Sequence, residues 1–169
     1  MDPFDFQPRT RVIFGAGSIA RLGEIALELN FQKTLLVADR GMVDSGHVEE
    51  ALAPLRKAGI RVSCFHDFEI NPDSKMVQTG MEYAAPFQVD SIIGLGGGSS
   101  LDCAKGINFV LTNGGRMQDY VGYGRAEKHQ VQQMIKLLLG LIFRAGQTGR
   151  GHSRWGMWLL SHPFIRPGS

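Results

Sequence analysis

The chain has 169 residues, of which 43% are hydrophobic and 20% are charged, and its net charge is +2. This length suits about one domain of ~100–200 residues, and the composition argues against intrinsic disorder. The longest apolar stretch, Leu137–Phe143, is far shorter than the ~20 residues that a membrane-spanning helix needs. The acidic N-terminus lacks the layout of a signal peptide, and two cysteines are too few for a secreted disulfide scaffold. We therefore expect a cytoplasmic protein with no membrane partner.

The charge is distributed unevenly along the chain. Residues 1–127 contain all sixteen acidic residues and twelve of the eighteen Lys and Arg, which gives this part a net charge of −4. Residues 128–169 contain six basic residues and no acidic one, a net charge of +6. Such a tail can indicate an arm that binds nucleic acid or anionic lipid. However, the six charges are scattered and not interleaved with aromatic residues, so we expect no nucleic-acid partner.

The first part of the chain alternates between expected strands and expected helices. In chain order the pattern predicts strand Arg11–Phe14, helix Ser18–Leu29, strand Thr34–Ala38, a helix capped by Ser45 and ended by Gly59, strand Ile60–Phe65, a helix capped by Asp73, strand Ser91–Leu95 and helix Leu101–Leu111. Beyond residue 128 the pattern predicts one helix at most, over Gln130–Phe143. Strands separated by helices predict an α/β fold with a Rossmann-like parallel sheet and helices on both faces.

Two glycine-rich turns between a strand and a helix compete as the nucleotide site. The first, Gly15–Ala20, has the Gly-x-Gly-x-x-Ala spacing of a dinucleotide fingerprint, and Asp39 ends the next strand. The second, Gly94–Ser100, contains three consecutive glycines and two serines at a helix start. Its backbone can approach a phosphate closely, and its hydroxyl and N–H groups can bind the anion. Each turn is also explained by a tight bend without a ligand, so these residues alone leave both sites open.

Three acidic or turn-forming positions accompany these glycines. Asp39 can bond the ribose hydroxyls of a dinucleotide and repel a 2′-phosphate, which favours NAD over NADP, or it can simply form a turn. Asn71–Asp73 is most simply a turn followed by a helix cap. Asp102 lies in the first turns of its helix, where a carboxylate stabilises the positive helix end.

Several motifs follow one another at a consistent spacing over about residues 8–124. They are Phe14-Gly15-Ala16-Gly17, Val37-Ala38-Asp39-Arg40-Gly41, Asn71-Pro72, Gly96-Gly97-Gly98-Ser99 with Asp102, and Ala104-Lys105. Together they closely resemble the N-terminal half of the iron-containing alcohol dehydrogenases. The resemblance implies an α/β dinucleotide-binding domain, which in the family precedes an all-helical domain that holds a divalent metal. It is compatible with a homodimer.

The resemblance also implies a site. It places the pyrophosphate at Gly97, Gly98 and Ser99 rather than at the first glycine turn. The cofactor-binding residues that it implies are Asp39, Asn71, Gly96, Gly97, Gly98, Ser99, Ser100 and Asp102. The implied cofactors are NAD and, in the intact family, iron or zinc, which polarises the oxygen of a small alcohol or aldehyde during hydride transfer. Related polyol dehydrogenases and dehydroquinate-synthase-like enzymes share the triple-glycine turn and remain alternatives.

Residues 128–169 depart from this resemblance. Family members continue with Thr-Thr-Ala-Gly-Thr-Gly-Ser-Glu, whereas the nearest stretch here, Arg144–Gly151, lacks the Thr pair and the Ser-Glu. The family's metal ligands are one Asp and three His, but no acidic residue follows Glu127, and His129, His152 and His162 have a different spacing. We therefore expect an NAD-binding domain over residues 1–127 and a divergent basic tail from a truncated or frame-shifted coding sequence. This predicts no catalytic residue and no metal ligand in the chain, which can leave a catalytically inert nucleotide-binding fragment.

Overall fold

The computed structural model describes residues 11–121, 133–141 and 155–161. The elements in these ranges are β1 (Arg11–Ala16), η1 (Ser18–Arg21), α1 (Leu22–Glu28), β2 (Lys33–Ala38), α2 (Arg40–Asp44), α3 (His47–Lys57), β3 (Arg61–Phe65), α4 (Ser74–Ala84), η2 (Ala85–Phe87), β4 (Ser91–Gly96), α5 (Gly98–Asn113), η3 (Met117–Tyr120), β5 (Gln133–Leu141) and β6 (Trp155–Ser161). Within them, no helix combines the length and the hydrophobicity needed to cross a membrane.

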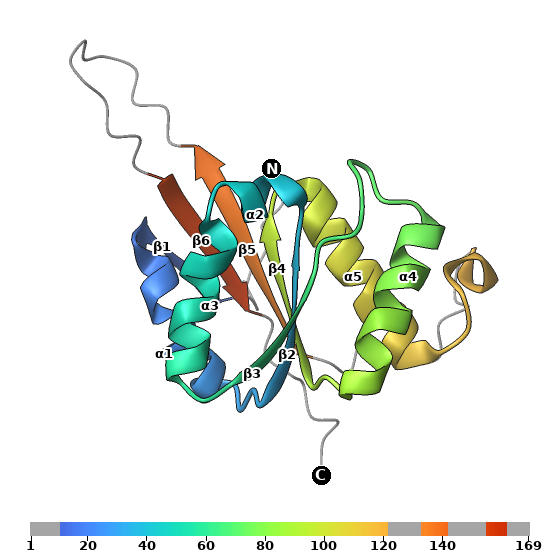
Figure 1. The fold of residues 1–169 in the computed structure, drawn as a ribbon, viewed down its shortest axis with the longest axis horizontal. Coiled ribbons are helices and arrows are strands. Elements are labelled where there is room, and N and C mark those ends of the chain that lie inside the picture. Colours follow the sequence, from blue (N-terminus) through green and yellow to red (C-terminus); the bar gives the residue numbers. More distant parts are fainter. Residues whose placement is uncertain (1–10, 122–132, 142–154, 162–169) are drawn as a thin grey trace, which may run out of the picture.

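One six-stranded sheet, in the order β1-β6-β5-β4-β2-β3, forms the middle layer (Figure 1). Strands β5, β4, β2 and β3 pair in parallel, whereas β6 runs antiparallel to both of its neighbours, β5 and β1. Helices α1, α2 and α3 lie on one side of the sheet and α4 and α5 on the other. The predicted α/β fold with a parallel sheet and helices on both faces is confirmed, with one antiparallel strand in addition.

Each face of the sheet carries its own apolar core. Leu36 and Ile93 pack with α1 and α3 on one face, and Leu35 and Ile92 pack with α4 and α5 on the other; all four side chains are fully buried. Successive strand residues point to opposite faces, so a strand covered on both sides needs apolar residues at every position. This explains why the sequence of β2 and β4 consists mainly of consecutive apolar residues, from which both strands were predicted.

The helix caps agree only in part with the prediction. Asp73 caps α4 as expected, since its carboxylate accepts two backbone N–H groups of the first turn, each at 2.9 Å. The predicted cap at Ser45 is wrong, because the N-cap of α3 is Gly46 in the left-handed conformation (φ 82°). Ser45 instead ends the short helix α2, which begins after Asp39 and was not predicted.

The predicted helix over Gln130–Phe143 is also wrong. Residues 133–141 form strand β5, whose register against β4 runs from Ser91 with Gln133 to Gly96 with Leu138. The following strand, β6, lies in a stretch for which no regular structure was expected. An apolar run cannot be assigned to helix or strand by its periodicity, and here a parallel neighbour with free backbone groups decides the outcome. The proposed boundary at residue 127 stays a prediction.

Both cysteine thiols are poor nucleophiles in this fold. Burial raises the pKa of Cys103 from 9.0 to about 12, and it also raises the pKa of the half-buried Cys64. Because the thiolate is the reactive form, neither residue is available for nucleophilic chemistry near neutral pH.

The contact between α1 and α3 depends on Gly23. A Cβ added there lies 2.3 Å from the carbonyl oxygen of Pro54, which belongs to the α3 backbone and cannot rotate away. We expect Gly23→Ala to lower the free energy of unfolding by about 1–3 kcal/mol, as overpacking outweighs the better helix propensity of alanine. Denaturant titration followed by circular dichroism measures this. Gly15→Ala is the control, since no atom of the described residues lies within 4 Å of a Cβ at Gly15. Equal stability of the two variants would contradict the prediction.

Candidate nucleotide-binding site

The carboxyl ends of β2 and β4 lie side by side at the upper edge of the sheet in Figure 1. From β2 the chain crosses to β3 on one side, whereas from β4 it crosses to β5 on the other, so the connections leave these two neighbouring strands in opposite directions. Such a divergence leaves a crevice between the loops, and α/β proteins commonly bind ligands there. Asp39 directly follows β2, and Gly97 directly follows β4. Asp39 and the second glycine turn therefore both lie at this crevice.

The three glycines shape the connection from β4 to α5. Gly96 is buried with a φ of 132°, and a Cβ there lies 2.6 Å from the Ser100 Oγ and 3.0 Å from the Asp39 Oδ2, so only glycine fits. Gly97 and Gly98 are exposed, and no atom of the described part of the chain lies within 4 Å of a Cβ added at either. The backbone at these two positions is consequently open to close approach by a ligand.

The start of α5 has the properties of an anion-binding site. The helix has 16 residues, and its N-cap, Gly97, has no side chain with which to cap it. The N–H groups of the first turn have no intrahelical acceptor, and the helix dipole makes this end positive. A phosphate beside Gly97 and Gly98 can satisfy these donors.

Two hydrogen bonds join the end of β2 to α5. Ser100, which is fully buried, donates its hydroxyl to the Asp39 Oδ2 at 2.8 Å and accepts the backbone N–H of Asp39 at 3.2 Å. The other carboxylate oxygen accepts the N–H of Met42 at 3.1 Å and so caps α2. An ionised carboxylate offers about four acceptor positions. Asp39 is therefore held in place and still has capacity to accept further hydroxyl groups.

The loop between β3 and α4 is fixed against the same glycine turn. The backbone N–H of Asn71 donates to the Ser99 Oγ at 3.1 Å. Asn71 has a φ of 56°, a left-handed conformation that asparagine tolerates better than most residues. Its neighbour Ile70 is 84% exposed.

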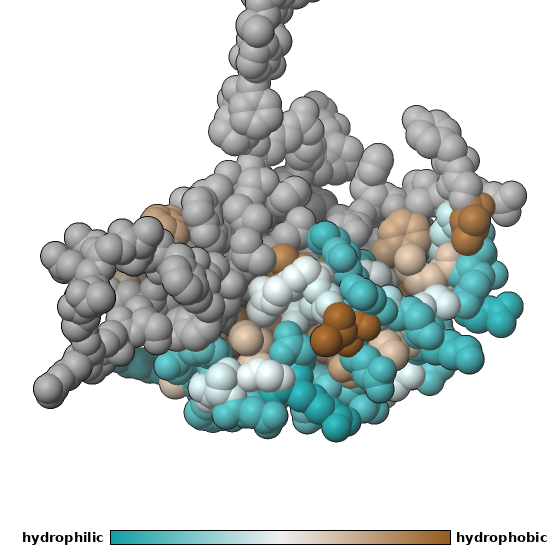
Figure 2. Space-filling view, turned by 90° about the horizontal axis from the view of Figure 1, so that it is seen from above, coloured by the Kyte–Doolittle hydropathy of each residue, from teal (hydrophilic) through white to brown (hydrophobic). Residues whose placement is uncertain are grey.

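Seen from above, the described surface is mainly hydrophilic, and its hydrophobic residues form separate spots (Figure 2).

Asp102 is the predicted site residue with the fewest links to the others. It lies on the exposed side of α5, and its carboxylate accepts a hydrogen bond from the Lys105 ammonium at 2.8 Å. The other predicted residues form one connected group: Asp39, Asn71, Gly96, Gly97, Gly98, Ser99 and Ser100.

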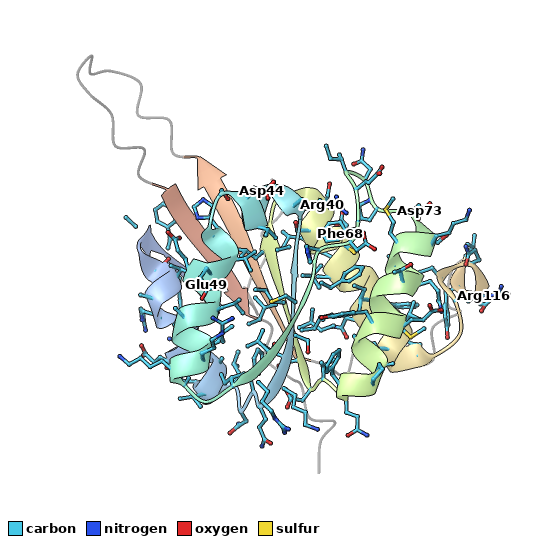
Figure 3. The ribbon with its side chains drawn as sticks, viewed as in Figure 1. Arg40, Asp44, Glu49, Phe68, Asp73 and Arg116 are labelled. Carbon is cyan, nitrogen blue, oxygen red and sulfur yellow. The ribbon has the colours of Figure 1, made fainter. Side chains whose placement is uncertain are left out.

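A cavity of about 400 Å³ lies between α2 and the segment that follows β3. Its lining residues are Arg40, Val43, Asp44, His66 and Asp67. The Arg40 Nη2 is 3.4 Å from the Asp67 Oδ1, and Figure 3 shows Arg40 and Asp44 on α2 at the upper end of the sheet. None of these residues was among the predicted cofactor-binding residues, although Arg40 belongs to the motif that contains Asp39. Their position along the chain could have indicated them, because Arg40 and Asp67 each lie within two residues of the carboxyl end of a strand, where α/β proteins commonly bind ligands.

The first glycine turn lies elsewhere on the sheet. β1 is the edge strand, and β6 and β5 separate it from β4. Gly17 has a φ of 74° and precedes the short 3₁₀ helix η1. The requirement for a left-handed residue is sufficient to explain a glycine at this position.

Among residues 11–121, 133–141 and 155–161, no three His, Cys, Asp or Glu side chains are gathered so that they could hold a metal ion. The three tail histidines, His129, His152 and His162, lie outside these ranges, as does Arg144–Gly151. The described residues thus give no fit to a divalent metal, and we assign no chemical step to one here.

The fold and this site define an α/β domain in which a helix start without a side-chain cap lies at the carboxyl edge of the sheet. Residues 8–139 match the family model of iron-containing alcohol dehydrogenase, so the chain belongs to this family. The match extends beyond the resemblance expected over residues 8–124 and includes most of β5.

Named relatives of the chain are dehydrogenases and a reductase. It is 37% identical over 121 residues to 1,3-propanediol dehydrogenase of Citrobacter freundii, covering 70% of this chain and 31% of that protein. It is 34% identical over 123 residues to NAD-dependent methanol dehydrogenase of Bacillus methanolicus, covering 73% and 32%. Sulfoacetaldehyde reductase from Bifidobacterium kashiwanohense, solved in complex with NAD+, is 26% identical with a TM-score of 0.65, covering 72% and 32%. The chain thus spans about a third of the length of these relatives.

The Ser100 hydroxyl should contribute measurably to stability. Ser100→Ala removes both of its bonds with Asp39, and we expect the free energy of unfolding to fall by about 1–3 kcal/mol, as for a buried group left without its partner. Ser99→Ala is the matched control, because the Ser99 hydroxyl is only partly buried and its bond is to an exposed loop. Denaturant titration of both variants tests this, and a loss in Ser99→Ala as large as in Ser100→Ala would contradict it.

Proposed function

We propose that this chain provides the NAD-binding part of an NAD-dependent alcohol dehydrogenase. The observation that carries the proposal is the uncapped start of α5, with Gly97 and Gly98 open and Asp39 held beside them. Membership of the iron-containing alcohol dehydrogenase family supports it. The relatives named as NAD-dependent methanol dehydrogenase and as a reductase in complex with NAD+ support NAD as the cofactor.

Each part of the site has a separate task in this proposal. The backbone at Gly97 and Gly98, with the Ser99 hydroxyl, binds the pyrophosphate at the positive end of α5. Asp39 accepts a ribose hydroxyl with the acceptor positions that Ser100 and Met42 leave open. Asn71 holds its loop against Ser99, and Asp102 stabilises the first turns of α5. Bound NAD would accept hydride from the carbon of a small alcohol, or NADH would return it to an aldehyde.

We further propose that the metal of the family, iron or zinc, has no ligand set in this chain. The absence of any Asp or Glu after residue 127 supports this, because the resembling proteins contribute an acidic ligand beyond that point. The boundary at residue 127 between an NAD-binding domain and a divergent tail stays a prediction, and the family match continues past it to residue 139. A cytoplasmic location and a homodimer stay predictions.

Cofactor binding should depend on the second glycine turn. We expect Gly98→Val to abolish the binding of NADH, because the new side chain meets no atom of the residues that the structure describes and would instead fill the space for the pyrophosphate. Gly17→Val should act mainly on stability, by about 1–2 kcal/mol, since valine is strained at a φ of 74°. Fluorescence titration with NADH, with folding checked by circular dichroism, measures both. A folded Gly17→Val protein that no longer binds NADH would move the phosphate site to the first turn.

The chain itself should not oxidise alcohols. Polarisation of an alcohol oxygen requires a metal held by several protein ligands with one position open, and the described residues provide no such group. We expect no reduction of NAD above background with short alcohols or diols, with or without added iron or zinc. Turnover that a chelator removes and added metal restores would overturn this prediction and point to ligands among His129, His152 and His162 or in a second copy.

A further inference from the structure

Arg40 occupies the position from which a cation commonly binds the extra phosphate of NADP. It directly follows Asp39, at the start of α2, and it lines the cavity between α2 and the segment that follows β3. In dinucleotide-binding folds an arginine near the ribose end accommodates the 2′-phosphate. A guanidinium is well suited to this because it can donate two parallel hydrogen bonds to phosphate oxygens. The position of Arg40 alone would favour the binding of NADP, whereas Asp39 favours the binding of NAD.

Arg40 is paired, however, with an acidic residue from another strand end. Its Nη2 lies 3.4 Å from the Oδ1 of Asp67, which follows β3. Asp44 lines the same cavity, so that two carboxylates and one guanidinium face it, with His66 beside them. Three acidic residues therefore accompany Arg40: Asp39 before it in the chain, and Asp44 and Asp67 at the cavity. A 2′-phosphate would have to compete with Asp67 for the guanidinium.

We propose that Asp67 is a specificity-determining residue that acts through Arg40. It is a positioning residue: by occupying the guanidinium it prevents Arg40 from binding a 2′-phosphate, and it thereby supports selection of NAD over NADP. The inference rests on the proposed function, since it takes the dinucleotide to lie at the carboxyl edge of β2 and β4. The Arg40 and Asp67 side chains are each 74% exposed, so the pair contributes little to folding and can be removed with the fold retained.

The test is the ratio of the Kd for NADPH to the Kd for NADH, measured by fluorescence titration of the 169-residue chain at low ionic strength. We expect Asp67→Asn to lower this ratio about five- to tenfold, the effect of giving a phosphate access to one charged partner. Asp44→Asn is the matched control. It removes the same charge from the same cavity, but within the described residues Asp44 makes no ion pair with Arg40. Its ratio should change less than about twofold.

A double variant separates the action of Arg40 from a general field effect. Arg40→Ala in the Asp67→Asn background should return the ratio to that of the unmodified chain. If the ratio in Asp67→Asn stays unchanged while NADH still binds, or if the gain persists without Arg40, the role of Asp67 is refuted and the proposed function stands. If the unmodified chain binds no NADH, the proposed function fails, and this inference fails with it.

Discussion

The fully buried hydroxyl of Ser100 both donates to and accepts from Asp39, a residue 61 positions earlier in the chain. This pair ties the end of β2 to the first turn of α5, and it leaves no room for a side chain at Gly96, whose Cβ would meet both partners. It also orients the carboxylate that caps α2. The backbone at Gly97 and Gly98, the next two positions along the chain, is exposed. A buried polar contact and an open stretch of backbone thus lie next to each other at this edge of the sheet.

Most of the α/β pattern could be predicted because burial on both faces imposes a recognisable composition. β2 and β4 are apolar at nearly every position, and Asp73 caps its helix with the geometry its residue type favours. The errors have physical causes as well. The short helix α2 is stabilised by the side chain of Asp39 rather than by an amphipathic pattern, so the cap of the next helix was misplaced at Ser45. β5 is rich in leucine, and its pairing with β4 and β6, which its periodicity does not reveal, makes it a strand.

The candidate site was predictable to the extent that it is local in sequence. The glycine turn and its serines are contiguous, and Asp39 is recognisable as the residue that ends a strand. The contacts that join them are not contiguous: Asn71 reaches Ser99 from another loop, and Arg40 meets Asp67 across two strand ends. The residues of the two glycine turns left both open as the phosphate site, and the prediction of Gly97, Gly98 and Ser99 rested on the family resemblance. Strand order, which places β1 at the edge, is information that only the folded structure contains.

The antiparallel strand β6 has a consequence for the order in which the protein can fold. Among the described strands, β1 pairs only with β6, and its register joins Arg11 to Ser161 and Ala16 to Gly156. On the ribosome β1 is made first, yet its partner is made some 150 residues later. The segment from β2 to α5 is complete by Asn113 and contains only shorter-range pairings, which form faster. Until β6 is made, nascent β1 has no partner among the described strands, and a strand with free backbone groups is open to pairing with another chain.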